Sequence, residues 1–137
     1  MPIWVCPKCQ RQFARKGQGH ECSPAMSLEE YFSTGPPFER PIFEAVMAGL
    51  DDRVGPIHIE PVSVGIFLKR ARSFCELRPM TRWVAVGFGM PRTLQSARVS
   101  RKVVDSWHVV NVRGPDEVDE QLLDWLTEAY EASPPAD

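Results

Sequence analysis

Four residues near the start of the chain have the types and the spacing of a metal site. Cys6 and Cys9 form a C-x2-C pair, and His20 and Cys22 follow ten residues later as an H-x-C pair. Zinc in proteins takes four sulfur, nitrogen or oxygen ligands in a tetrahedron, and a site with all four protein ligands is structural. The spacing therefore predicts a structural zinc knuckle, with a redox C-x-x-C pair or four unrelated residues as the alternatives.

The length of this segment supports the metal interpretation. Residues 1–22 bury too little surface to fold alone, and Trp4 and Phe13 are their only large apolar side chains besides Ile3 and Val5. Metal binding would supply the missing free energy. A redox C-x-x-C usually begins a helix in a βαβ unit, a pattern that this segment lacks.

Length and composition indicate one ordinary domain with a small appendage. The 137 residues are 43% hydrophobic and 25% charged. We expect a zinc knuckle at 1–24, an α+β domain at 25–133 and a tail at 134–137. No apolar run approaches the ~20 residues that a membrane span needs, and the N-terminus has no secretory signal pattern. The expected location is the bacterial cytoplasm, where cysteines more often bind metal than form disulfides.

Capping signals and apolar periodicity predict the helices. Ser27 and Glu30 form a capping box before a short helical turn, and a helix then runs to about Leu50. The last helix is expected to begin at Pro115, which suits a first helical position, and to end near Glu131. Each long helix has one apolar stripe, so both are expected to cover a single face of a sheet.

Short apolar runs between turn residues predict an antiparallel sheet meander. The expected strands are 57–59, 64–68, 73–78, 82–88 and 106–112, with 99–104 as a further candidate. Alternation divides their side chains into two sets. The apolar set, expected to face the helices, is Val64, Ile66, Leu68, Cys75, Leu77, Val84, Val86, Phe88, Val110 and Val112. The mixed set is Gly65, Phe67, Lys69, Phe74, Glu76, Arg78, Trp83, Ala85, Trp107, Val109 and Asn111.

The mixed set and the charge distribution indicate a binding surface. Residues 53–114 carry a net charge of +8, whereas 115–137 carry −8. Aromatic and basic side chains on a sheet face can stack bases and hold phosphates, so nucleic acid or another polyanion is the leading ligand. The candidate ligand-binding residues are Phe67, Lys69, Arg70, Arg72, Phe74, Arg78, Trp83, Trp107 and His108. Three alternatives are open: a small-molecule or enzyme pocket near Arg78, Arg82 and His108, a homodimer interface, or a face covered by the knuckle or by loop 89–101.

Signals for catalysis are weak. The sequence has no P-loop, G-x-G-x-x-G, H-E-x-x-H or G-x-S-x-G motif. Cys75 is expected to be an inert buried thiol, and a hydrogen-bonded structural role is the commoner fate of a strand histidine such as His108. The sequence therefore favours a binding protein over an enzyme.

The residues also resemble a known family. The pattern Trp4-x-Cys6-Pro7-x-Cys9-x3-Phe13, followed by His20-x-Cys22 and Ser27-Leu28-x-x-Tyr31-Phe32, is similar to bacterial proteins that carry domain of unknown function 5655. Phe67, Phe74, the pair Trp107-His108 and the ending from Asp116 to Tyr130 extend the resemblance. It implies a compact α+β domain, with some likeness to frataxin-type helix-and-sheet sandwiches, and no established activity. Relatives of the domain are fused to nuclease-like or other nucleic-acid-linked modules, and a histidine at the position of His108 recurs among them.

Overall fold

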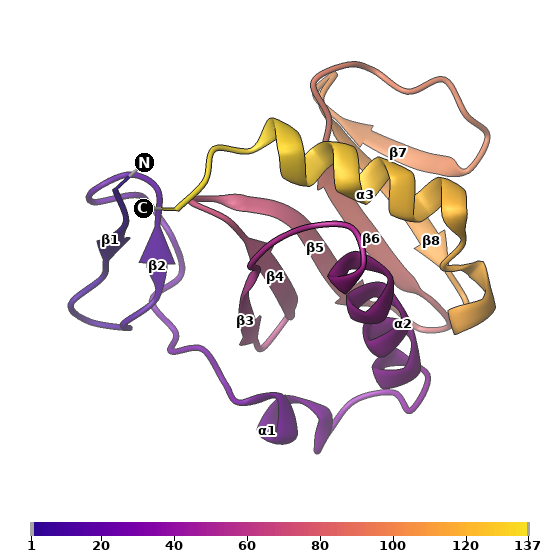
Figure 1. Cartoon of the computed structure of the whole chain (residues 1–137). Helices are drawn as coiled ribbons and strands as arrows, with labels where there is room; N and C mark the ends of the chain where they lie inside the picture. Colours follow the sequence, from indigo (N-terminus) through magenta and orange to yellow (C-terminus); the bar gives the residue numbers. More distant parts are fainter. Residues whose placement is uncertain (1, 137) are drawn as a thin grey trace.

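The chain is described by a computed structural model that covers residues 2–136. Met1 and Asp137, which the predicted knuckle (1–24) and tail (134–137) include, lie outside the described residues. A small knuckle, with β1 (Trp4–Val5) and β2 (Gln12–Phe13), precedes a six-stranded sheet that carries the two long helices (Figure 1). The predicted α+β class is confirmed.

Local signals set the first two helices. The Ser27 hydroxyl accepts a hydrogen bond from the Glu30 backbone N–H at 3.1 Å, and α1 (Leu28–Phe32) follows, as the capping box predicts. The next helix, α2 (Glu39–Asp51), buries one apolar stripe made of Ile42, Phe43, Val46 and Leu50. Among residues 2–136, no helix has the length and apolar character that crossing a bilayer requires.

The last helix begins later than the sequence predicts. Pro115 opens only a 3-10 turn, η1 (Pro115–Glu117). Asp119 is the N-cap of α3 (Glu120–Ala132), because its carboxylate accepts a hydrogen bond from the Leu122 N–H at 3.0 Å. That bond satisfies an N–H that the first turn of a helix would otherwise leave unpaired, so the carboxylate rather than the proline fixes the start.

The antiparallel sheet follows a meander over its first four strands, β3 (His58–Val62), β4 (Gly65–Lys69), β5 (Ser73–Pro79) and β6 (Val84–Gly89). The strand β8 (Trp107–Val112) then pairs with β6, and β7 (Val99–Val103) lies outside it at the edge. The predicted meander is confirmed up to β6, and the segment 90–98 carries the chain past β8. Pro61 fits within β3 because that strand is the other edge of the sheet, where a missing N–H breaks no ladder bond.

The apolar set of strand side chains forms the core together with the helices. Every member is buried except Val64, which lies in the turn between β3 and β4. From the helices, Leu50, Leu122 and Leu126 are fully buried in the same cluster. Burial raises the pKa of the Cys75 thiol, which agrees with the predicted inert role.

Phe74 lies on the opposite side of the sheet from the one predicted. A β-bulge occurs where Lys69 pairs with Ser73 while Leu68 pairs with Cys75, which leaves Phe74 as the extra residue. The extra residue breaks the simple alternation, and the Phe74 ring packs edge-on against Tyr130 of α3 at a centroid distance of 5.2 Å. Phe74 is therefore a core residue and no part of a ligand-binding face.

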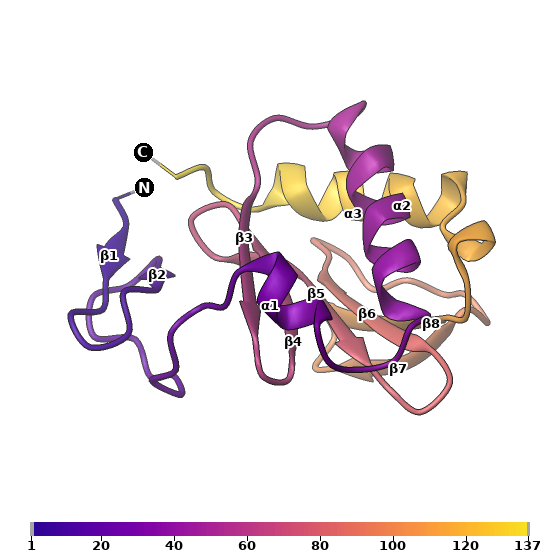
Figure 2. The same ribbon diagram turned by 90° about the horizontal axis from the view of Figure 1, so that it is seen from below.

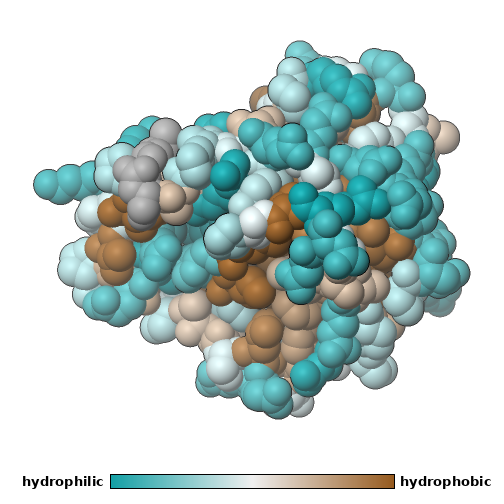
Figure 3. Space-filling model, viewed as in Figure 1, coloured by the Kyte–Doolittle hydropathy of each residue, from teal (hydrophilic) through white to brown (hydrophobic). Residues whose placement is uncertain are grey.

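The two long helices lie together on one side of the sheet (Figure 2). Seen from that side, the margins of the surface are hydrophilic, and hydrophobic residues gather toward the middle of the view (Figure 3). We call the opposite side the outer face; it carries Phe67, Arg78, Trp107 and Val109. Any extended ligand surface on the sheet must lie on this outer face, because the helices occupy the other.

A buried carboxyl at the start of α2 makes the stability of the domain depend on pH. Glu39 is 2% exposed and accepts a hydrogen bond from the Tyr31 hydroxyl. Burial raises the pKa of Glu39 above its ordinary 4.5, although the Tyr31 hydrogen bond opposes the rise. The folded protein therefore binds this proton more tightly than the unfolded chain, and the stabilisation is lost as the pH rises through the raised pKa.

We expect the Glu39→Gln variant, whose side chain is neutral at every pH, not to lose stability in this way as the pH rises. The free energy of unfolding of both proteins would be measured in urea at about pH 5 and about pH 8. The value for the variant minus the value for wild type should be larger at the higher pH. The same difference at both pH values would show that Glu39 does not titrate in this range. Comparing the two proteins at each pH cancels the titration of all other groups.

Candidate metal centre and its surroundings

A tight loop between β1 and β2 positions the first two predicted ligands. Trp4 pairs with Phe13 across the two strands, so residues 6–11 must turn back within a few residues. The Cys6 N–H donates to the Arg11 carbonyl at 3.0 Å, and Gln10, with a φ of 64°, supplies the left-handed conformation that the loop requires. Cys6 and Cys9 are each 3% exposed inside this loop.

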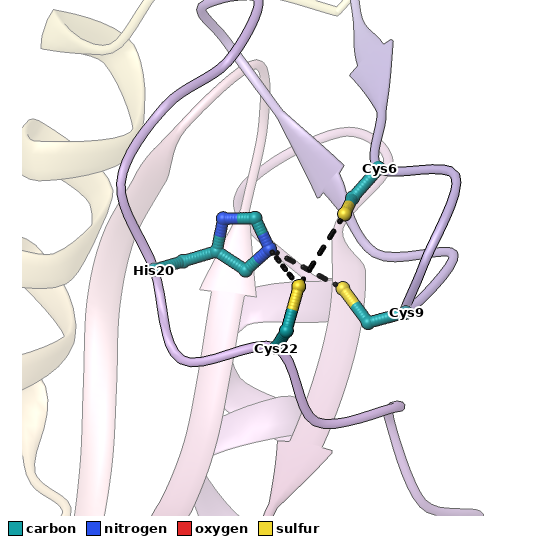
Figure 4. A group of neighbouring side chains, drawn as sticks. All are labelled: Cys6, Cys9, His20 and Cys22. Atoms are coloured by element: carbon teal, nitrogen blue, oxygen red, sulfur yellow. Dashed lines mark hydrogen bonds between the residues drawn. The ribbon is translucent and has the colours of Figure 1, made fainter.

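The four predicted ligands converge on one point (Figure 4). The sulfur and nitrogen atoms of Cys6, Cys9, His20 and Cys22 all lie within 4.8 Å of one another. The Sγ atoms of Cys6 and Cys22 are 3.6 Å apart, and His20 Nε2 is 3.4 Å from Cys9 Sγ and 3.3 Å from Cys22 Sγ. These four side chains could bind a metal ion, as their spacing in the sequence predicts.

The far side of the His20 ring is fixed by the backbone. Its Nδ1 lies 2.7 Å from the Gln18 carbonyl oxygen, which can only accept, so Nδ1 carries the proton. The lone pair of Nε2 therefore points at the sulfur atoms. Such a hydrogen bond on the distant nitrogen is what orients histidine ligands in metal sites.

The pKa values of the neighbouring thiols Cys6 and Cys22 are shifted in opposite directions. Hydrogen bonds from the backbone of Cys9 and then Lys8 lower the pKa of Cys6 to about 6, although burial works against them. The neighbouring Cys6 sulfur raises the pKa of Cys22 to about 11, and burial adds to the rise. A cation among these sulfur atoms would stabilise their thiolate forms against mutual repulsion. The thiolate is the form of cysteine that binds metal.

Aromatic rings cover the centre on one side. The Phe13 ring lies 4.1 Å from the His20 ring, between centroids, and Trp4 lies 6.0 Å from Phe13. With Cys6 and Cys9 these residues form a small hydrophobic cluster that shares no member with the main core. The shape of the knuckle therefore depends on the four candidate metal ligands at its centre and on its contacts with the α+β domain.

That attachment is a buried carboxylate, Glu60 on β3. Its Oε1 accepts from Arg11 Nε at 3.0 Å and lies 2.8 Å from Lys69 Nζ. Its Oε2 accepts from the Gln12 backbone N–H at 3.0 Å and lies 3.0 Å from His58 Nε2. Burial alone would raise the pKa of Glu60, but the hydrogen bonds from His58, Lys69 and Gln12 hold it well below its usual range.

Glu60 is the residue of this site that the sequence analysis did not single out. It lies two residues after His58 on β3 and opposite Phe67 on β4, so it shares the outer face with Lys69. The signal that could have identified it is a carboxylate, Glu60, on the same face of neighbouring strands as a lysine, Lys69. Its true partners, Arg11 and Gln12, are more than 45 positions away and could not be paired with it from the sequence.

The knuckle and the outer face enclose a cleft of about 340 Å³. Four of the predicted ligand-binding residues line it: Phe67, Lys69, Arg72 and Arg78. The opposite wall includes Arg11, Phe13 and His20 of the knuckle. The alternative in which the knuckle folds over the mixed face is therefore confirmed at the β3–β4 end of the sheet.

Trp107 and Trp83 lie farther along the sheet. Trp107 packs over Gly87, where a Cβ atom would come within 2.8 Å of the indole nitrogen, so the close approach depends on glycine. It lines a shallow hollow of about 240 Å³ with Arg78 and Arg101. Trp83 is half-buried, and the Arg113 guanidinium carbon lies 5.7 Å from its ring centre.

Arg70 and His108 have structural partners on the helix side of the sheet. The Arg70 guanidinium donates to the carbonyls of Tyr130 and Ser133 at 3.1 and 2.8 Å, and so caps the end of α3. His108 is fully buried, and its Nε2 accepts from the Leu94 N–H at 2.9 Å. The predicted pocket shared by Arg78 and His108 is therefore wrong for the described residues, since the two side chains lie on opposite faces.

Comparisons with known proteins assign the larger part of the chain. No curated protein and no solved structure matches it. The sequence profile of the family whose description is Domain of unknown function (DUF5655) matches residues 28–133, from the first residue of α1 to the residue after α3. The knuckle lies before this match. Because the matched segment is most of the chain, the chain belongs to the DUF5655 family.

Proposed function

We propose that the knuckle holds one structural zinc ion. With Zn–S near 2.3 Å and Zn–N near 2.0 Å, a tetrahedral site places two sulfurs about 3.8 Å apart and a sulfur and a nitrogen about 3.5 Å apart. The observed separations of 3.6, 3.4 and 3.3 Å are close to these values. Three thiolates and one imidazole are also the donors that zinc prefers in tetrahedral sites. The expected setting is a reducing one, the bacterial cytoplasm, where such thiols stay free.

The outer face is proposed to bind a polyanion, with single-stranded nucleic acid as the leading ligand. The observation that carries this is the presence of two half-buried aromatic rings, Phe67 and Trp107, on the side without helices. Stacking on such rings suits any base, because every base has a flat π face. The protein would then act as a non-catalytic binding module.

Unpaired cations accompany these rings. Within residues 2–136, Arg72 beside the cleft and Arg101 beside Trp107 make no ion pair. By contrast, Arg11 and Lys69 share an ion pair with Glu60, and Arg78 pairs with Glu76. Phosphate binding therefore depends on Arg72 and Arg101 more than on the basic side chains inside the cleft.

A small anionic molecule is the second candidate, because the cleft between the knuckle and the sheet is large enough to hold one. Its 340 Å³ lies within the usual range of about 300–1,000 Å³ for ligand pockets. Homodimerisation through the outer face is the remaining prediction. The experiment below distinguishes homodimerisation from nucleic-acid binding.

We expect Trp107→Ala to weaken binding of a labelled oligothymidylate, followed by fluorescence anisotropy at low salt, roughly 5- to 150-fold, because stacking contributes about 1–3 kcal/mol per base. Arg101→Ser should weaken binding and reduce its salt dependence. Arg40→Ser, which replaces an exposed arginine on α2, is the matched control and should change neither.

Absence of binding by wild type at low salt would exclude nucleic acid as the ligand. A concentration-dependent dimer that Trp107→Ala abolishes would favour the homodimer interface instead.

A further inference from the structure

The cluster around Glu60 joins the knuckle to the sheet from both sides. Arg11 and the Gln12 N–H come from the knuckle, only two and three residues after Cys9, and His58 and Lys69 come from β3 and β4. Lys69 Nζ also donates to the Gln12 carbonyl at 2.7 Å. The backbone that follows the first ligand pair is thus held at Gln12 through both its N–H and its C=O.

Burial of the cluster requires the knuckle. The side chains of Arg11, Glu60 and Lys69 are 7, 1 and 4% exposed. The Arg11 guanidinium and Lys69 ammonium also lie over the rings of Phe67 and Phe13, at 5.4 and 4.3 Å from the ring centres. If the knuckle left the sheet, Glu60 and Lys69 would be exposed to water and the Phe13 ring would lose its contact with the Lys69 ammonium.

The knuckle in turn has few other means of holding its shape. Its own apolar cluster consists of Cys6, Cys9 and Phe13, with Trp4 packed against it. A metal ion and the attachment to Glu60 are therefore the two main constraints on the loop that presents Cys6 and Cys9. Two constraints on one flexible segment reinforce each other, because each lowers the conformational entropy that the other must overcome.

We propose that Glu60 is a positioning residue for the metal site, and that metal binding in the knuckle and docking of the knuckle on β3 and β4 favour each other. This inference rests on the proposed zinc site. By linkage, the coupling acts in both directions: Glu60 tightens metal binding, and the metal stabilises the β3–β4 edge of the domain. The cleft, whose walls come from both parts, is formed only in the docked state.

The test is the zinc affinity of the full chain, measured by competition with a chromophoric chelator. Glu60→Gln should bind zinc about 5- to 150-fold more weakly than wild type, the usual size of a coupling between two linked equilibria. Glu76→Gln is the matched control, since Glu76 lies on β5, two strands from Glu60, and its ion pair is with Arg78. Its zinc affinity should equal that of wild type.

A second variant protects the test from simple misfolding. Arg11→Gln removes a docking bond, together with the hydrogen bond from Arg11 Nη1 to the Glu21 carbonyl at 3.3 Å, but leaves Glu60 paired with Lys69, so the α+β domain keeps a neutral pair. It should also weaken zinc binding. A wild-type protein that binds no zinc would overturn the proposed metal site. Wild-type zinc binding with unchanged affinity in both Glu60→Gln and Arg11→Gln would overturn the coupling alone.

Discussion

Replacing Cys9 by Ser is expected to abolish stable metal binding and to unfold the knuckle while the α+β domain stays folded. Structural zinc contributes about 10–16 kcal/mol of apparent binding free energy in finger-sized peptides, far more than the small cluster of Cys6, Phe13 and Trp4 can replace. The domain should survive because its core shares no residue with that cluster. Hydrogen exchange should show amides of residues 4–22 losing protection while those of β5, β6 and β8, away from the edge on which the knuckle docks, keep theirs.

The fourth cysteine provides the control for this prediction. Cys75→Ala removes a thiol from the main core, where it is fully buried and belongs to a different cluster from that of the knuckle. That variant should lose domain stability through a small cavity and keep its metal. If Cys9→Ser kept full protection of residues 4–22, the knuckle would owe its shape to something other than a metal.

Replacing His108 by Ala is expected to destabilise the domain by about 3 kcal/mol, since a buried side chain and two hydrogen bonds are lost together. The imidazole stacks on Phe88 at 5.9 Å between ring centres, accepts from the Leu94 N–H, and holds its own proton toward the Ser106 carbonyl at 3.1 Å. Alanine leaves a cavity and an unpaired buried N–H at the loop that carries the chain from β6 to β7.

Urea unfolding measures this loss, and ligand binding decides what it means. If His108 is structural, the folded fraction of His108→Ala should bind the oligothymidylate as tightly as wild type. Unchanged stability combined with lost binding would instead assign His108 a direct functional role. The distinction matters because, by the family resemblance, a histidine recurs at the position of His108.

The four candidate metal ligands and the cap of α1 could be predicted because their signals are local. Cys6, Cys9, His20 and Cys22 converge as their spacing implies, and Ser27 caps α1 through Glu30 as its motif implies. Local signals compete, however, at the start of α3. Pro115 and Asp119 both suit a helix start, and the carboxylate of Asp119 prevails because it satisfies a backbone N–H.

The errors arise where one residue changes the register or where partners are distant in sequence. The bulge at Phe74 turns its ring from the predicted outer face to the core, because strand alternation assumes no extra residue. The exchange of β7 and β8 depends on the path of the segment 90–98, which carries no strand pattern. Glu60 was missed because a buried carboxylate is recognised by the cations around it, and Arg11 lies 49 positions away.

The central claim is tested most directly by the metal content of the intact wild-type chain, measured by mass spectrometry under non-denaturing conditions. The account predicts a mass increment of one zinc ion per chain, removed by acid or a strong chelator together with the exchange protection of residues 4–22. A chain that carries no metal yet keeps that segment protected would contradict it.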